Sequence, residues 1–84
     1  MQEPISFSDK EILSLYKIIG SNVKKYRNEK GLTQLQLSQS MGYKSISLVS
    51  AAELASDSKH FNLEHLYKIA KILDINMADL LLDS

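Results

Sequence analysis

Five consecutive residues near the middle of the chain carry side chains that could bind either nucleic acid or another protein. They supply one cation, two hydroxyls and two large apolar groups, and they are Lys44, Ser45, Ile46, Ser47 and Leu48. A lysine can neutralise a phosphate, a serine can hydrogen-bond to a base edge, and an apolar side chain can pack against a thymine methyl group. The same apolar side chains could instead contact a protein partner. Which use applies depends on the helices that hold this segment.

The basic residues are unevenly distributed along the chain. Net charge is zero over the 84 residues. However, residues 17–44 hold six basic residues and one acidic residue, a net +5, whereas residues 45–84 hold three basic and six acidic residues, a net −3. A basic region can attract phosphate, although ordinary solvated helix faces would give the same pattern. Charge alone therefore leaves nucleic-acid binding open.

No residues have the spacing of a catalytic or metal site. The chain has no cysteine, no glycine-rich phosphate loop and no nucleophile motif. His60 and His65, with Asp57 and Glu64 near them, are poorly spaced for a metal, so we expect surface histidines, no metal and no cofactor. No apolar run is long enough to cross a membrane. We expect a cytoplasmic binding protein, not an enzyme, with no membrane contact and no evident small-molecule ligand.

The first element that could support the segment is a long helix. Ser8 and Glu11 have the spacing of a capping box, which predicts a helix from Asp9 to about Glu29. Gly20 lies in its middle, so two helices meeting there would also fit, and Gly31 supplies the stop. Residues three or four apart predict an inward-facing stripe of Ile12, Leu15, Ile19, Val23 and Tyr26.

Four shorter helices are predicted after this one. Thr33 begins the second with another capping box, and the third, residues 46–54, turns Val49, Ala52 and Glu53 inward. A loop of about eight residues follows. Asn62 and Asn76 then cap the last two helices. The expected inner stripe of the fourth helix is Leu63, Leu66, Ile69, Ala70 and Leu73, and the tyrosines expected in or beside the core are Tyr16, Tyr26, Tyr43 and Tyr67. We predict a compact all-α, five-helix domain over residues 9–84, with an extended first helix and a flexible N-terminus at residues 1–8.

Three stretches resemble the lambda-repressor and Cro-like (XRE) helix-turn-helix family. They are "IGSNVKKYRNEKGLTQLQLSQSMGY", "SAAE" and "NLEHLYKIAKILDINMADLLL", and together they cover residues 19–82. The resemblance implies a lambda-repressor-like DNA-binding domain in which the helix starting at Thr33 crosses the DNA backbone. The helix containing Ser47 to Ala52 would enter the major groove. It also implies a buried structural ion pair between Arg27 and Glu53.

Contacts to DNA can be assigned to two groups of residues. The expected phosphate contacts are Thr33, Gln34, Lys44, Lys59 and Asn62, at helix starts or in the turns just before them. The expected base contacts are Lys44, Ser45, Ile46, Ser47, Leu48 and Ala51. This set departs from the more polar side chains common in the family, so we expect a half-site that contains thymine.

Two functions remain open. The first is a sequence-specific transcriptional regulator that binds double-stranded DNA as a homodimer on a two-fold-symmetric operator. Small members of the family include phage repressors, controller proteins of restriction-modification operons and antitoxins, and the sequence does not choose among them. The expected dimer interface is Ile75, Leu81 and Leu82, with the extra turns before Ile19 as a second possibility. The alternative is a protein-interaction module that has kept the fold and lost DNA binding.

Overall fold

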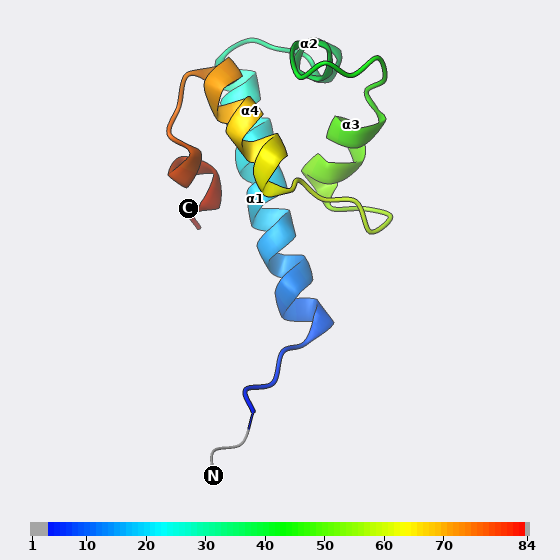
Figure 1. Cartoon of the computed structure of the whole chain (residues 1–84), viewed down its shortest axis with the longest axis vertical. Coiled ribbons are helices and arrows are strands. Elements are labelled where there is room, and N and C mark those ends of the chain that lie inside the picture. Colours follow the sequence, from blue (N-terminus) through cyan, green and yellow to red (C-terminus); the bar gives the residue numbers. More distant parts are fainter. Residues whose placement is uncertain (1–3, 84) are drawn as a thin grey trace.

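Helices account for all the regular secondary structure in residues 4–83, the part of the chain that the computed structural model describes. The predicted flexible N-terminus at residues 1–8 and the predicted domain end at residue 84 lie partly outside these residues. The elements in chain order are α1 (Asp9–Glu29), α2 (Gln34–Ser40), α3 (Ser47–Leu54), α4 (Leu63–Leu73) and the 3₁₀-helix η1 (Met77–Leu81) (Figure 1). The all-α prediction is therefore confirmed.

The last element differs from the fifth α-helix that we predicted. It is a 3₁₀-helix of five residues, and the Asn76 side chain makes no capping hydrogen bond to it. Instead, the backbone N–H of Asp79 donates to the backbone oxygen of Asn76 at 3.0 Å. Five residues allow little of the α-helical hydrogen-bond ladder, so the tighter 3₁₀ pattern replaces it. Asn22 of α1 holds this segment, since its buried side-chain amide donates to the backbone oxygens of Leu80 and Leu82 at 3.0 and 2.8 Å.

Helix α1 is a single uninterrupted helix despite Gly20. Its start is fixed by the predicted capping box, in which the Ser8 hydroxyl accepts from the backbone N–H of Glu11 at 3.1 Å. Gly31, at φ +74°, follows its end. A Cβ at position 20 would lie 2.5 Å from the backbone oxygens of both Ala52 and Glu53. Gly20 is therefore explained by the close approach of the α1 and α3 backbones, not by a break in α1.

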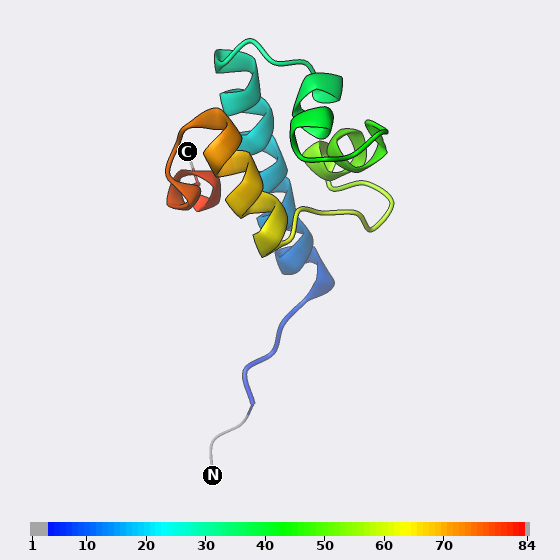
Figure 2. The same ribbon diagram turned by 45° about the horizontal axis from the view of Figure 1, so that its top comes forward.

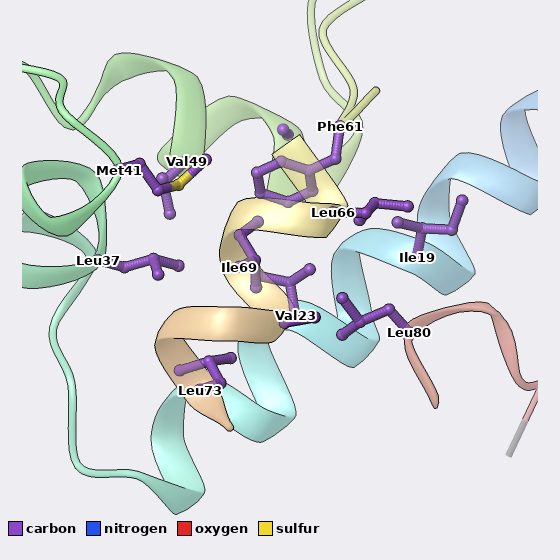
Figure 3. Close-up of a cluster of buried hydrophobic side chains, with 12 residues drawn as sticks. Ile19, Val23, Leu37, Met41, Val49, Phe61, Leu66, Ile69, Leu73 and Leu80 are labelled. Carbon is purple, nitrogen blue, oxygen red and sulfur yellow. The ribbon is translucent and has the colours of Figure 1, made fainter. Parts of the chain in front are cut away.

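The core lies where α1, α3 and α4 meet, with α2 and η1 closing opposite sides (Figure 2). Side chains from all five elements point into it, together with Phe61 from the loop before α4 (Figure 3). The buried apolar residues of this cluster are Ile19, Val23, Leu37, Met41, Val49, Ala52, Phe61, Leu66, Ile69, Ala70, Leu73 and Leu80.

Four residues that we expected to face the core do not. Ile12 and Leu15 are exposed because the first turns of α1 extend beyond the other helices (Figure 1). Leu63 is 70% exposed, since Phe61 fills the core at that end of α4. Tyr67 is also exposed, whereas the other three tyrosines are half-buried against the core. Helical periodicity identified the correct face of α1 but not the point at which the core ends.

The start of α4 contains a histidine whose protonation should affect stability. The Asn62 side chain accepts from the backbone N–H of His65 at 2.8 Å, and the His65 imidazole Nδ1 accepts from the backbone N–H of Asn62 at 3.0 Å. Burial lowers the pKa of His65; the carboxylate of Glu64 opposes this shift, while Lys68 and His60 add to it. Both histidines are half-buried, His60 against Tyr16 and His65 at the start of α4.

We expect acidification below the ordinary histidine pKa of about 6.5 to destabilise the wild-type protein more than a His65→Gln variant. Because the folded-state pKa is lowered, the unfolded chain binds the proton more readily, and stability is lost as the pH falls through the folded pKa. Glutamine at this position can still complete the capping box but does not titrate. Thermal melts at neutral and mildly acidic pH measure the difference. Equal acid-dependent shifts in Tm for the two proteins would exclude His65 as the source.

Candidate nucleic-acid interface

Helices α2 and α3 form a pair on one side of α1, opposite η1 (Figure 2). The turn between them is tied to α2, since the backbone N–H of Tyr43 donates to the backbone oxygen of Ser38 at 2.9 Å. Ser38 is completely buried. Leu37 and Met41 face Val49 across the pair (Figure 3). The apolar contact and the small Ser38 side chain together fix how α3 is presented to solvent.

An ion pair joins this helix pair to α1. The Arg27 guanidinium donates twice to the Glu53 carboxylate, from Nε at 2.7 Å and from Nη2 at 3.0 Å. Its Nη1 donates to the backbone oxygen of Leu32 at 2.7 Å, and Gln34 of α2 donates to Glu53 Oε1 at 3.0 Å. Both charged side chains are almost fully buried. One carboxylate therefore links α1, α2 and α3.

The outward face of α3 carries small or apolar side chains. Ser47, Ser50, Ala51 and Leu54 lie on this face at the spacing i, i+3, i+4, i+7. The first is exposed and the middle two are half-buried. Leu54 is 64% exposed and was missed in the sequence, although its helical spacing from Ser47 could have revealed it.

The start of α3 differs from the prediction. The helix begins at Ser47, not residue 46, and Ile46 occupies the capping position with an exposed side chain. Here the Ser45 hydroxyl accepts from the backbone N–H of Ser47 at 3.0 Å, and the two serine hydroxyls lie 2.7 Å apart. The backbone N–H of the first residue of α3 thus bonds to a side chain that precedes the helix. Leu48 is half-buried against the core, so only part of its side chain is exposed.

Two lysines line one cleft beside the start of α3. The cleft has a volume of about 550 Å³, and its walls are Tyr43, Lys44, Ser45, Ser47, Leu48, Ser58, Lys59 and His60. Lys44 comes from the α2–α3 turn and Lys59 from the α3–α4 loop, and both are exposed. Neither forms an ion pair within residues 4–83. The cleft thus combines two unneutralised cations with several hydroxyls, a suitable lining for an anion.

The loop that carries Lys59 is held in a defined position. The His60 ring stacks on Tyr16 of α1 with 3.8 Å between ring centroids. The backbone N–H of Lys59 donates to the backbone oxygen of Ser56 at 2.9 Å. Asp57 and Ser58, which precede it, both have left-handed backbone conformations. Ring stacking and a tight turn therefore hold Lys59 in the cleft that Lys44 also lines.

The other three expected phosphate contacts have internal hydrogen bonds. The Thr33 side chain accepts from the backbone N–H of Gln36 at 3.0 Å, which caps α2. Gln34 donates to Glu53, and Asn62 caps α4. Thr33 and Asn62 are exposed, and Gln34 is half-buried. The backbone and remaining side-chain atoms of these three residues stay candidates for phosphate contacts. Lys44 and Lys59 are better candidates, because no ion pair within residues 4–83 competes with phosphate for them.

The remaining predicted sites lie away from this face. Leu81 and Leu82 are exposed at the η1 end, while Ile75 is half-buried against the core. Residues 4–83 contain no group of three or more histidine or acidic side chains arranged to hold a metal ion. None of the helices in this range has the length and apolar character needed to cross a membrane.

Comparison with known families agrees with this geometry. Residues 23–80, which run from the middle of α1 into η1, match the family model HTH_3, described as helix-turn-helix. The search of curated proteins found no match for the chain.

Proposed function

Because the chain belongs to the lambda repressor-like (XRE) family of helix-turn-helix DNA-binding domains, we propose that it is a sequence-specific transcriptional regulator. In this proposal α3 enters the major groove, and two copies related by a two-fold axis bind a two-fold-symmetric operator. Leu81 and Leu82 are one candidate for the surface that joins the copies.

The cleft shared by Lys44 and Lys59 is the observation that carries the proposal. The two cations come from different loops but line the same hollow, next to the first turn of α3. A helix that enters the major groove has phosphates close to its ends, and lysines placed there supply sequence-independent affinity. The lysines would therefore set the position of α3 on the duplex, while the helix itself contacts the bases.

Base recognition would come from side chains at the start and on the outward face of α3, of which Ala51 is half-buried and the others are exposed. Ile46, Ala51 and Leu54 can pack against thymine methyl groups, and the Ser47 hydroxyl can bond to a base edge. Because Ser45 and Ser47 hydrogen-bond to each other, each hydroxyl has fewer bonds left for a base. Apolar contact to thymine is accordingly the main source of specificity in this proposal.

Replacing both lysines in a Lys44→Ala, Lys59→Ala variant should weaken binding to duplex DNA and make it less sensitive to salt. Each lost phosphate contact lowers the slope of log K against log salt by about 0.9. Fluorescence anisotropy titrations against random-sequence DNA at several salt concentrations measure both effects. The matched control is Lys24→Ala, Lys71→Ala, which removes the same charge from exposed positions on α1 and α4. Equal weakening by both double variants would contradict a specific role for the cleft.

A second candidate function has one observation in its favour. Ile46, just before α3, and Leu54, at its end, have exposed apolar side chains. The chain also has no net charge that would attract it to DNA. An apolar recognition helix on a neutral domain also suits contact with a protein. Wild-type protein that failed to bind DNA even at low salt would favour this protein-interaction module over the regulator.

A further inference from the structure

The N-terminal part of the chain has an apolar surface that the rest of the domain does not cover. We infer that this surface binds the same surface of a second copy of the chain. It comprises residues of the extended segment before α1 and of the first two turns of α1. These residues, with their exposed fractions, are Ile5 (80%), Phe7 (76%), Ile12 (45%), Leu13 (40%) and Leu15 (47%). We call this set the N-terminal apolar surface.

The α1 part of this surface is a well-formed helix. Ser8 and Glu11 cap it with reciprocal hydrogen bonds of 3.1 and 3.3 Å, so the apolar side chains are held on helical turns. Ile12 continues the stripe of Ile19 and Val23, which are buried in the core. Ile12 itself is exposed, because the first turns of α1 extend past the other helices (Figure 1). Ile12 and Leu15 lie on one side of the helix and Leu13 on another, so the first turns of α1 expose apolar side chains on more than one side. Exposed apolar surface on an ordered element is typical of interaction sites.

A groove borders the same surface. It has a volume of about 260 Å³ and lies between α1 and the α3–α4 loop, with Asp9, Ile12, Leu13, Tyr16, Ala55, Ser58, Lys59 and His60 around it. The stacked rings of Tyr16 and His60 form part of its wall. Phe7, on the same chain, is largely exposed and so does not occupy it. Each copy thus offers both an apolar groove and an apolar side chain suited to fill one.

The charges along α1 favour a second copy as the occupant. Residues 9–17 contain two acidic residues, Asp9 and Glu11, and two basic residues, Lys10 and Lys17. In an antiparallel pair of α1 helices centred on Leu13, Asp9 of one copy lies level with Lys17 of the other, because each is four residues from the centre. Asp9, Leu13 and Lys17 are four residues apart and so share one face of α1, and Asp9 and Leu13 also line the groove. A two-fold axis repeats the Asp9–Lys17 contact, and the zero net charge of the chain adds no overall repulsion.

This surface is larger than the one at the other end of the domain. Within residues 4–83, the exposed large apolar side chains at that end are Leu81 and Leu82, and Asn22 already holds the backbone at Leu80 and Leu82. Since the groove also includes Lys59, pairing through α1 would fix the phosphate-binding loops of two copies relative to each other. The inference rests on the homodimer of the proposed function but not on DNA binding, so the test is made without DNA.

Sedimentation velocity over a wide concentration range tests the inference on the full chain. We expect wild-type protein to dimerise and a Leu13→Glu variant to raise the dissociation constant about tenfold or more, which is 1.4 kcal/mol or more. The matched control, Leu63→Glu, adds a carboxylate at an exposed leucine outside the surface and should sediment like wild type. Circular dichroism checks that every variant stays folded.

A charge exchange gives the register of the pair. Lys17→Glu alone should weaken the dimer, and Asp9→Lys together with Lys17→Glu should restore it. Wild-type protein that stays monomeric at every concentration would overturn the inference. So would a dimer that survives Leu13→Glu but is lost in Leu81→Ser, Leu82→Ser, because the interface would then lie at the C-terminal end. DNA binding that failed while the dimer behaved as expected would count against the proposed function alone.

Discussion

Replacing Glu53 by alanine should lower the free energy of unfolding by about 3–5 kcal/mol. The Arg27 guanidinium is buried, and Glu53 accepts hydrogen bonds from two of its nitrogens at 2.7 and 3.0 Å. Truncating the carboxylate leaves that positive charge without its partner and also leaves Gln34 without its acceptor. A buried charge without a partner costs much more than the pair itself contributes. The loss should therefore exceed that from any exposed charge in the domain.

Urea denaturation followed by circular dichroism measures this loss. Glu64→Ala is the matched control, because Glu64 is exposed and its one ion pair within residues 4–83 is to Lys68 at 3.5 Å on the same helix. Exposed pairs of this kind contribute about 0.3–0.5 kcal/mol. An Arg27→Met, Glu53→Leu double variant should recover much of the stability, since apolar side chains can replace a buried ion pair. A Glu53→Ala protein as stable as the Glu64→Ala control would show that the ion pair does not hold the three helices together.

The structural role of Glu53 also separates folding from DNA binding. Glu53 lies on the buried face of α3, opposite the side chains that we propose to contact bases. At temperatures where the variant is still folded, its salt dependence of DNA binding should therefore match that of wild type. The Lys44→Ala, Lys59→Ala variant should show the reverse. Its free energy of unfolding should be unchanged, and its DNA affinity should depend less steeply on salt concentration.

Features fixed by neighbouring residues could be predicted from the sequence. The capping boxes at Ser8 and Thr33 are short-range hydrogen-bond patterns, and each helix begins where its box indicates. Asn62 predicted the start of α4 for the same reason. The order and spacing of the family motifs gave the arrangement of the helices, since no local pattern specifies which faces meet.

Features fixed by distant residues could not be predicted in the same way. The apolar stripe of α1 has the same spacing at Ile12 as at Val23, but only the position of the other helices determines which of them is buried. The candidate site shows the same limit. A hydrogen bond to Glu53 occupies the Gln34 side-chain amide, and a two-serine turn moves the start of α3 to Ser47. Lys44 and Lys59 are fifteen residues apart, and their shared cleft exists only because the loop packs on α1.

Gly20 provides a direct test of the packing that positions α3. Alanine in a helix interior is normally favoured over glycine by about 1 kcal/mol. Here, however, the added Cβ would lie 2.5 Å from the backbone oxygens of both Ala52 and Glu53. These are backbone atoms in a short helix, so they cannot move aside as the end of a flexible side chain can. To relieve the clash, α1 and α3 must separate, which also strains the Arg27–Glu53 ion pair.

We expect Gly20→Ala to destabilise the protein by about 1–3 kcal/mol, the usual cost of overpacking a core, despite the gain in helix propensity. Ser21→Ala is the matched control, because Ser21 is the next residue of α1 and is exposed, so its replacement should be neutral or slightly stabilising. Urea denaturation measures both variants. If Gly20→Ala were as stable as Ser21→Ala, the two backbones could not be in contact, and the orientation of α3 proposed for DNA binding would need another cause. If Gly20→Ala is destabilised as expected, a weaker affinity of the folded variant for DNA would link the α1–α3 contact to the placement of α3 in the major groove.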